Sequence, residues 1–423
     1  MTLVIGMNSG SSFDGIDVVL AEIGQAADGH PARPVFIDAL SRPWPVKVEE
    51  LVLKAFANEL SIFELTRLHY VAGAVYAEAA RALLDKRGLG PAEVEVIGVD
   101  GQTIYQEPPD HEQMAALPPG AGLVARWLDG PYPCGLQIGE PAVIAAHCDI
   151  PVVWNFRPSD HALGGTGAPL MQYLDFVAFR DIGPVLTLNI GGIANCQLAQ
   201  RDRSKMMAFD TGPGNVMMDY AARRLYGRDY DAGGQIAAAG TVHKPMLDEL
   251  MSHPFFRRRP PRSAWRLDFG AEFAARILDA YASLPPQDVM ATLCAFTAAS
   301  IVRSVTDHVP ALDEIGVVIA SGGGVRNATL MGMLAERLPA GPRLTTSDEF
   351  GIPPQFKEAV KFAVLAYATQ RGLANNIPAA SGAARYAVLG KSVQPPRLAR
   401  ESLAASHSGH RGATTGARPD AIQ

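Results

Sequence analysis

The feature that most constrains the fold of this chain is a strand–turn–strand pattern that occurs twice. Residues 3–20 and residues 185–198 each consist of two apolar runs joined by a short polar turn that contains glycine. Glycines let backbone N–H groups approach an anion closely, and the hydroxyls and carboxylates of the first turn suit phosphate and a divalent cation. An ordinary hairpin with a polar turn has the same pattern. Two copies, however, predict a chain folded as two similar halves around a nucleotide.

Two further glycine-containing stretches support a nucleotide site. Residues 315–327 consist of a predicted buried strand, three consecutive glycines and the start of a helix, which suits a shelf beneath a nucleoside. Asp210, Thr211 and Gly212 follow a predicted strand at 207–209. An aspartate at this point can orient a metal ion or its waters, although Asp is also a common helix cap.

Composition restricts the class of protein. A chain of 423 residues exceeds what one hydrophobic core usually fills, so two domains are expected. The formal net charge of −6 leaves no basic footprint for nucleic acid. The four cysteines form no C-x-x-C pair, which favours a reduced, cytoplasmic setting. We find no apolar run of the length of a membrane span and expect no membrane segment.

The order of the patterns suggests the domain boundaries. We expect a first domain over residues 1–165, a second over 166–391 and a disordered tail over 392–423, with a glycine-rich hinge at 164–169. Residues 105–135 are expected to form mainly loops. The basic, proline-containing patch Arg257–Arg262 is interpreted first as a solvated loop.

Nine motifs together resemble one known family. They are N-S-G-S-S-F-D-G-I-D (8–17), G-Q-T-I (101–104), Q-I-G-E-P (137–141), F-R-P-S-D (156–160), G-G-T-G-A-P-L (164–170), N-I-G-G-I-A-N (189–195), F-D-T-G-P-G-N (209–215), S-G-G-G-V-R-N (321–327) and K-E-A (357–359). In this order they closely resemble the anhydro-N-acetylmuramic acid kinase family, over about residues 3 to 391. The resemblance implies an α/β, two-domain actin-like, sugar-kinase and Hsp70 ATPase fold, with duplicated mixed sheets, flanking helices and a cleft between them.

The resemblance also implies a reaction. Such enzymes use ATP and Mg²⁺ to open a 1,6-anhydro sugar, and they consume water and release a sugar 6-phosphate. One base must activate water for attack on C1 while O6 is captured by the γ-phosphoryl group. By resemblance that base is Asp160; the alternative role for this residue is a helix cap after Pro158.

The resemblance assigns further residues to the site. Gln102, Thr103 and Arg157 fall where the family contacts the sugar, although Arg157 could equally form a structural ion pair. Asp14 and Glu358 fit positions that would hold Mg²⁺, directly or through water. The implied nucleotide-binding positions are Gly10, Ser11, Ser12, Phe13, Asp14, Gly15, Ile16, Asp17, Asn189, Gly191, Gly192, Asn195, Asp210, Thr211, Gly212, Gly214, Asn215, Gly322, Gly323, Gly324 and Asn327.

Departures from the family pattern leave the substrate open. Asn8 and the segment 386–391 are similar to levoglucosan kinases, which act on 1,6-anhydroglucose, whereas residues 137–140 resemble the muramyl branch. Asp100 and Asn155 also depart from the usual residues. An acid at Asp100 would disfavour a sugar that carries a lactyl carboxylate. A non-catalytic, actin-like nucleotide- or sugar-binding protein is the remaining alternative, and the family suggests a homodimer.

Overall fold

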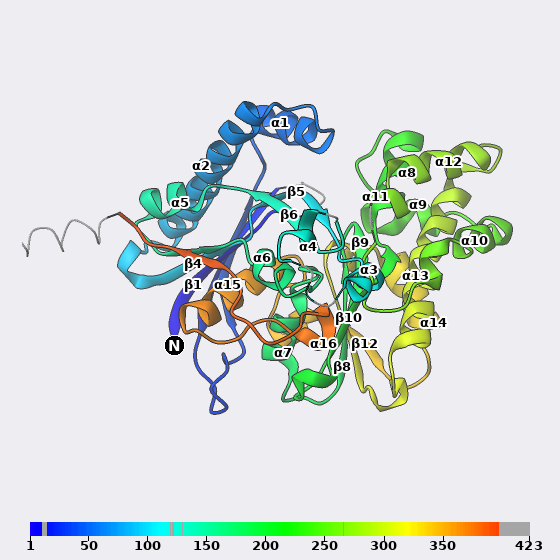
Figure 1. Cartoon of the computed structure of the whole chain (residues 1–423). Coiled ribbons are helices and arrows are strands. Elements are labelled where there is room, and N and C mark those ends of the chain that lie inside the picture. The colour runs from blue at the N-terminus through cyan, green and yellow to red at the C-terminus, as the bar shows by residue number, and fades with distance from the viewer. Residues whose placement is uncertain (11–14, 119, 121, 129, 265, 397–423) are drawn as a thin grey trace, which may run out of the picture.

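The computed structural model places the two predicted hairpins in two separate mixed sheets (Figure 1). It describes residues 1–10, 15–118, 120, 122–128, 130–264 and 266–396. The α/β class expected from the sequence is confirmed. The first sheet contains β1 (Thr2–Asn8), β2 (Ile16–Ile23), β3 (Val35–Arg42), β4 (Val94–Val99), β7 (Val152–Trp154) and β13 (Lys391–Val393), and the second contains β8 (Val185–Ile190), β9 (Ile193–Ala199), β10 (Met207–Pro213), β11 (Val317–Ser321) and β12 (Arg343–Thr346).

The two sheets share one plan. Their strand orders are β13-β7-β4-β1-β2-β3 and β10-β9-β8-β11-β12. In each sheet an antiparallel hairpin is followed by strands that run parallel to its first strand. Asn8 pairs with Asp17 at the mouth of the first turn, and Asn189 pairs with Asn195 at the mouth of the second. The two turns therefore leave equivalent edges of two similar sheets, as expected for a chain folded as two similar halves.

Helix α15 (Lys357–Gln370) lies directly on one face of the first sheet. Two glycines in the strands make this contact possible. A Cβ atom on Gly6 of β1 would lie 2.0 Å from the carbonyl oxygen of Ala359, and one on Gly98 of β4 would lie 2.1 Å from that of Phe362. The helix backbone therefore touches the strands, and the start of α15 is fixed beside the end of β1.

A second helix, α7 (Met171–Phe179), packs between α15 and the second sheet. Lys357 Nζ lies 2.7 Å from Asp175 Oδ1, and both side chains are fully buried. The other oxygen of Asp175 accepts a hydrogen bond from Thr187 of β8 at 2.6 Å. A buried ion pair thus connects α15, which rests on the first sheet, to a strand of the second. We refer to this connection as the spine.

The outer faces of both sheets are covered by other helices. The main ones on the first sheet are α1 (Val46–Phe56), α2 (Ile62–Arg87) and α5 (Pro141–Cys148). Helix α2 begins at a capping box formed by Ser61 and Glu64 and ends at Gly88, which has a left-handed conformation. The helices around the second sheet are α8 (Val216–Tyr226), α9 (Gln235–Ala238), α10 (Lys244–Met251), α11 (Arg266–Phe269), α12 (Ala271–Ala280), α13 (Pro286–His308) and α14 (Ala328–Arg337).

The expectation that no segment has the length and composition of a membrane span is wrong for α13. This helix has 23 residues, and its most apolar window has a mean hydropathy of 1.5. However, 78% of that window is buried inside the protein, against α8, α10, α14 and β10. We therefore identify α13 as the central core helix of the second half.

Residues 102–138 contain more regular structure than expected. Strand β5 (Gln102–Glu107) pairs antiparallel with β6 (Cys134–Ile138), and two short helices lie between them, α3 (His111–Ala116) and α4 (Ala125–Leu128). Gln102 and Thr103 stand at the start of β5. The remaining helices are α6 (Arg157–His161) and α16 (Pro378–Ser381), with 3₁₀ turns at Pro91–Glu93, Arg203–Lys205, Ala232–Gly234, Pro254–Arg257, Leu312–Glu314, Gly323–Arg326 and Ser347–Phe350.

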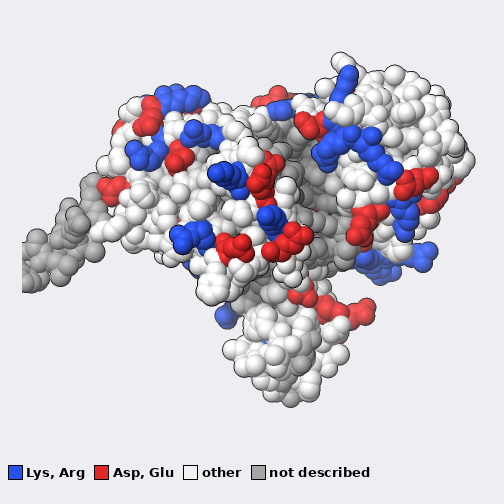
Figure 2. Space-filling view, turned by 90° about the horizontal axis from the view of Figure 1, so that it is seen from above, with Lys and Arg blue, Asp and Glu red and all other residues white. Residues whose placement is uncertain are grey.

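A groove opens where the two halves face each other. Figure 2 shows the surface hollowed between them, with acidic and basic side chains interspersed over the face in view. Residues 107–112 from the first half and Arg258 from the second line a groove of about 630 Å³. The boundary near residue 165 remains a prediction. Residues 392 and 393 belong to β13, and residues 397–423 of the predicted tail lie outside the described part of the chain.

Candidate active site

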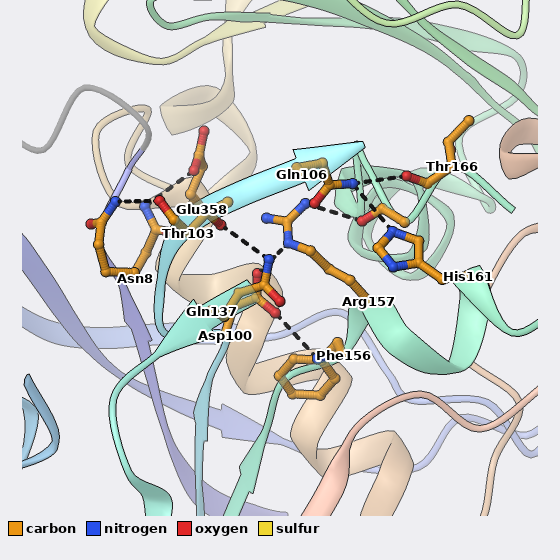
Figure 3. Close-up of polar contacts among 12 residues, drawn as sticks. Asn8, Asp100, Thr103, Gln106, Gln137, Phe156, Arg157, His161, Thr166 and Glu358 are labelled. Carbon is orange, nitrogen blue, oxygen red and sulfur yellow. Dashed lines mark hydrogen bonds and ion pairs between the residues drawn. The ribbon is translucent and has the colours of Figure 1, made fainter. Parts of the chain in front are cut away.

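Glu358 connects the ends of the two hairpins. Asn8 Nδ2 donates to Glu358 Oε2 at 3.1 Å, and Asn189 Nδ2 donates to Oε1 at 3.0 Å. Asn8 ends β1, Asn189 stands near the end of β8, and Glu358 lies in the first turn of α15. Figure 3 shows Asn8 and Glu358 facing each other at the strand end. The structure therefore places the predicted metal position Glu358 between the two hairpins that are predicted to bind phosphate.

The turn of the first hairpin, predicted to bind phosphate, is only partly described. Ser11, Ser12, Phe13 and Asp14, all predicted nucleotide contacts, lie outside the described residues. On either side of them, Gly10 and Gly15 are half-buried and Ile16 is fully buried. Asp17 accepts a hydrogen bond from the Ser41 hydroxyl on β3.

The glycines of the second turn form one tight cluster. The N–H groups of Gly214 and Asn215 donate to the carbonyls of Gly192 and Gly191 at 2.9 and 2.8 Å. A Cβ atom on Gly214 would lie 2.1 Å from the carbonyl oxygen of Gly191, so no other residue fits without a shift. Gly322 also approaches this turn, because its Cβ would lie 2.7 Å from the Ile190 carbonyl. The structure thus brings three predicted nucleotide motifs together.

Within the F-D-T-G motif, the Asp210 and Thr211 side chains make hydrogen bonds to the protein backbone. Asp210 accepts from the Ala264 N–H at 2.7 Å, and Thr211 donates from Oγ1 to the Ala194 carbonyl at 3.0 Å. Burial raises the pKa of Asp210 to about 7, while the Ala264 N–H and the nearby Arg262 oppose this shift. Gly212, whose φ of 138° favours glycine, continues the strand. This motif shapes the backbone beneath the turn rather than presenting free side chains.

The predicted nucleoside shelf has a structural partner that sequence reasoning missed. Asn327 caps α14 by accepting from the Leu330 N–H at 2.9 Å. A Cβ atom on Gly234 would lie 2.0 Å from Asn327 Oδ1, so the turn at 233–234 packs directly against the shelf. Both Gly233 and Gly234 have positive φ. The two adjacent glycines after Asp231 are the sequence feature that could have predicted this turn. Gly323 and Gly324 open the 3₁₀ turn of the shelf. In the second hairpin, Asn195 Oδ1 accepts a hydrogen bond from Gln197 Nε2 at 2.6 Å.

On the side predicted for the sugar, Arg157 lies between an acid and a backbone carbonyl. Its Nε donates to Asp100 Oδ2 at 2.6 Å, and its NH1 donates to the Gly167 carbonyl at 3.0 Å. Asp100 is almost fully buried and also accepts from the Phe156 N–H at 3.2 Å. The expectation that Asp100 would repel a carboxylate on the sugar is therefore not supported, because Arg157 neutralises its charge. Figure 3 shows Arg157 directed toward Asp100.

The predicted sugar contact Gln102 is fully buried. Its Oε1 accepts from the Ser9 hydroxyl at 2.6 Å, and its Nε2 donates to the Thr103 carbonyl at 3.2 Å. Trp44 Nε1 donates in turn to Ser9 at 3.0 Å. Gln102 therefore joins β5 to the turn of the first hairpin. Thr103 is half-buried, and its Oγ1 lies 3.5 Å from Gln137 Nε2.

Two glutamines and a histidine beside Arg157 were not predicted. Gln106 Nε2 donates to the Thr166 carbonyl at 3.0 Å and lies 3.3 Å from His161 Nε2 (Figure 3). The Oε1 atoms of Gln106 and Gln137 are buried without a partner among the described residues. Burial lowers the pKa of His161 to about 4, so this imidazole is neutral at pH 7. Two unsatisfied amide oxygens beside a guanidinium are suited to bind hydroxyl donors of a ligand.

Asp160, the predicted base, is fully buried on α6 and makes three hydrogen bonds. Its Oδ2 accepts from the Gly167 N–H at 3.0 Å, and its Oδ1 accepts from Ser381 Oγ at 3.0 Å and Asn376 Nδ2 at 3.3 Å. Burial raises the pKa of this carboxyl, and the three donors oppose the shift. Because a carboxylate offers about four lone-pair sites, one site on Oδ2 remains. Asp160 is connected to the Asp100–Arg157 pair through Gly167.

A second cation lies below this network. Lys361 stands one turn after Glu358 on α15 and is largely buried, with Nζ 4.2 Å from the centre of the Phe362 ring. Burial lowers the pKa of Lys361, and the charges of Glu358 and Asp100 oppose that shift. No group of three or more metal-ligating side chains occurs among the described residues.

Arg262, expected on a solvated loop, is buried instead and donates to the carbonyl of Asp210 at 2.9 Å.

Comparison with known proteins gives one consistent result. Residues 2–395 match the model of the anhydro-N-acetylmuramic acid kinase family. A protein of that name from Caldanaerobacter subterraneus subsp. tengcongensis is 35% identical over 398 residues, which cover 92% of this chain and 96% of that protein. Another from Francisella tularensis subsp. novicida is 35% identical over 391 residues, which cover 92% of this chain and 97% of that protein.

Solved structures resemble the chain more distantly. The activator of the 2-hydroxyisocaproyl-CoA dehydratase from Clostridium difficile, solved with bound ADPNP, is 12% identical, with a TM-score of 0.41. The superposition covers 88% of this chain and 96% of the activator.

Proposed function

The chain belongs to the anhydro-N-acetylmuramic acid kinase family, and from this membership we propose that it converts 1,6-anhydro-N-acetylmuramic acid, ATP and water to N-acetylmuramic acid 6-phosphate and ADP. The match over residues 2–395 carries this proposal. In the substrate, O6 is bound to C1, so no free hydroxyl is present at this position. Water must form a new bond to C1, the C1–O6 bond must break, and O6 must take the γ-phosphoryl group.

Asp160 is the proposed general base for the water. The remaining lone pair on Oδ2 would accept the proton as water attacks C1, a role worth about 10²–10⁴ in rate. Burial raises the pKa of Asp160, which makes the ionised form a better proton acceptor than an exposed aspartate. A glycosidase needs a second carboxyl group to protonate the leaving oxygen. Here the phosphoryl group captures that oxygen, so one carboxylate is sufficient.

Arg157 is the proposed anchor for the sugar. Its Nε and NH1 are used by Asp100 and Gly167, which fixes the plane of the guanidinium and leaves NH2 to donate to the ligand. Thr103 and the buried amide oxygens of Gln106 and Gln137 would complete the polar surface. Because Arg157 neutralises the charge of Asp100, repulsion by Asp100 no longer argues against a sugar with a lactyl carboxylate.

The nucleotide is proposed to lie across the two hairpin turns. The glycine cluster around Gly192, Gly214 and Gly322 leaves backbone close to where phosphates would bind, and Glu358 stands between the turns. Each Glu358 oxygen already accepts one amide hydrogen bond and keeps a second lone pair, which suits a cation bound through water. Mg²⁺, when bound, would neutralise charge between the β- and γ-phosphoryl groups.

ADP release measured with three alternatives tests this proposal. The purified full-length chain is assayed with Mg-ATP and 1,6-anhydro-N-acetylmuramic acid, with levoglucosan, or with no sugar. We expect the muramyl sugar to accelerate ADP release most. Faster release with levoglucosan would instead support the 1,6-anhydroglucose kinase suggested by Asn8 and residues 386–391. Equal release in all three would support a non-catalytic nucleotide-binding protein and contradict both kinase assignments.

Two further properties are proposed from family membership alone. We propose that the chain acts in the cytoplasm, where ATP is available, and that it forms a homodimer. Light scattering on the full-length chain at several concentrations tests the second point. A mass close to the 45.0 kDa of the single chain at every concentration would contradict it.

A further inference from the structure

The two side chains that hold Asp160 Oδ1 come from a segment more than 200 residues away, and that segment is itself firmly anchored. Asn376 accepts from the Ala387 N–H at 2.8 Å through Oδ1 and donates from Nδ2 to the Arg385 carbonyl at 3.0 Å. Arg203 donates to the Asn376 carbonyl and stacks over the Tyr386 ring at 4.5 Å. The position of the Asn376 amide is therefore fixed independently of Asp160.

Ser381 is held in the same way. It is the last residue of α16, it is almost fully buried, and its hydroxyl oxygen accepts from the Ala383 N–H at 3.3 Å. That contact orients the hydroxyl hydrogen toward Asp160 Oδ1, 3.0 Å away. A Cβ atom on Gly165 would lie 2.2 Å from Asp160 Oδ2, so only glycine leaves space beside the other oxygen.

Resting on the proposed function, we propose that Asn376 and Ser381 are positioning residues for the reaction. They fix the Asp160 carboxylate through Oδ1, so that the unoccupied lone pair of Oδ2 is presented to the water that attacks the anhydrosugar. Both donors are neutral. A neutral donor orients an ionised carboxylate without cancelling its charge, whereas an arginine or lysine at this position would weaken it as a base.

The ionisable groups around Asp160 are consistent with this role. Arg157 and His161 lie on the same helix, α6, while Arg203 lies behind Asn376. Arg157 is paired with Asp100. His161 is neutral at pH 7 because burial lowers its pKa to about 4. Arg203 reaches the backbone of Asn376 rather than the carboxylate. The hydrogen bonds to Asp160 in the described part of the chain come from neutral groups.

The pH dependence of kcat/KM for the anhydrosugar at saturating Mg-ATP tests this inference. We expect Ser381→Ala and Asn376→Ala each to move the acidic limb to higher pH by about 0.5–1 unit, because the ionised carboxylate loses a donor. KM for ATP should not change. Ser381→Thr, which keeps a hydroxyl, should restore the wild-type limb. Asn375→Ala is the matched control: Asn375 is equally buried and donates to the Leu365 carbonyl at 3.0 Å, with no bond to Asp160.

Failure of this inference and failure of the proposed function give different results. If Ser381→Ala and Asn376→Ala lower activity equally at every pH, as Asn375→Ala does, the two donors are purely structural and the inference is wrong. The two variants act on the same oxygen independently, so misfolding of one still leaves a decisive measurement. Asp160→Asn tests the proposed function itself: retention of sugar-dependent turnover would remove Asp160 from the mechanism whatever the other variants do.

Discussion

Arg157 donates from Nε to Asp100 at 2.6 Å, across the junction between α6 and the end of β4. The side chain of Asp100 is 4% exposed and that of Arg157 is 16% exposed. The pair therefore joins the end of β4 to α6, the helix that carries the predicted site residues Arg157 and Asp160.

Asp100→Asn should weaken both this junction and sugar binding. The new amide would direct its N–H groups toward one of the donors that now contact Asp100, Arg157 Nε or the Phe156 N–H. We therefore expect the free energy of unfolding to fall by about 1–3 kcal/mol. We also expect a raised KM for the sugar and an unchanged KM for ATP. Urea denaturation and steady-state kinetics measure the two effects. Asp38→Asn is the control, because its partner Lys86 is 48% exposed and the expected loss is below about 1 kcal/mol. Equal behaviour of the two variants would contradict the proposed role of the Asp100–Arg157 pair.

Gly6→Ala should destabilise the protein strongly. The new methyl group would lie 2.0 Å from the Ala359 carbonyl oxygen and would force α15 away from β1. We expect the free energy of unfolding to fall by about 1–3 kcal/mol, measured as a lower midpoint in chemical denaturation. Gly316→Ala, where no heavy atom lies within 4 Å of the added Cβ, should change stability by less than about 0.5 kcal/mol. A wild-type midpoint for Gly6→Ala would show that α15 can move freely on the sheet.

Glu358→Gln should impair phosphoryl transfer more than folding. Glutamine offers one acceptor where Asn8 and Asn189 need two, so one of the two hydrogen bonds is lost. We expect kcat to fall about 10–100-fold, the range seen when groups around a bound metal are removed, and more Mg²⁺ to be needed for half-maximal rate. Glu349→Gln, at an exposed pair with Arg343, is the control. If kcat and the Mg²⁺ requirement stay at wild-type values, Glu358 has no part in the nucleotide site.

Asp210 should make stability depend on pH. Its pKa is raised from 3.8 to about 7, so between these values the folded chain keeps a proton that the unfolded chain has released. Stability is therefore expected to fall as pH rises through this interval, by an amount on the order of a few kcal/mol.

Asp210→Asn removes this titration while its amide oxygen can still accept from the Ala264 N–H. Melting temperatures of the two proteins from pH 4 to pH 8 should therefore diverge, with the variant relatively more stable at high pH. Parallel curves would show that Asp210 titrates at an ordinary value in the folded chain.

The parts of the site that sequence reasoning identified are those encoded locally. The two hairpins, the glycine shelf and the position of Glu358 follow from short patterns of apolar residues, glycine and single acids. Such patterns work because a close backbone approach excludes side chains, as at Gly214 against Gly191. The resemblance of nine ordered motifs then supplied the reaction and the family.

What the sequence did not reveal depends on contacts between distant residues. Ser381 lies 221 residues from Asp160, in a segment without a recognised motif, and no local pattern links the two. Arg262 was expected in solvent because it stands in a basic, proline-rich run, yet stacking on Phe209 and Phe255 buries it. The sequence likewise presented Asp100 as an unpaired acid, since its partner Arg157 is 57 residues away.

The spine formed by Lys357, Asp175 and Thr187 has a consequence for how the two halves could move. It ties α15 on the first sheet to β8 of the second, immediately beside Glu358, so we expect any rotation of the two halves to take place about this line. Such a rotation displaces atoms in proportion to their distance from the axis. The strand ends at Asn8 and Asn189, where we propose that the nucleotide binds, would then shift least, while the rim formed by residues 107–112 and Arg258 would move furthest.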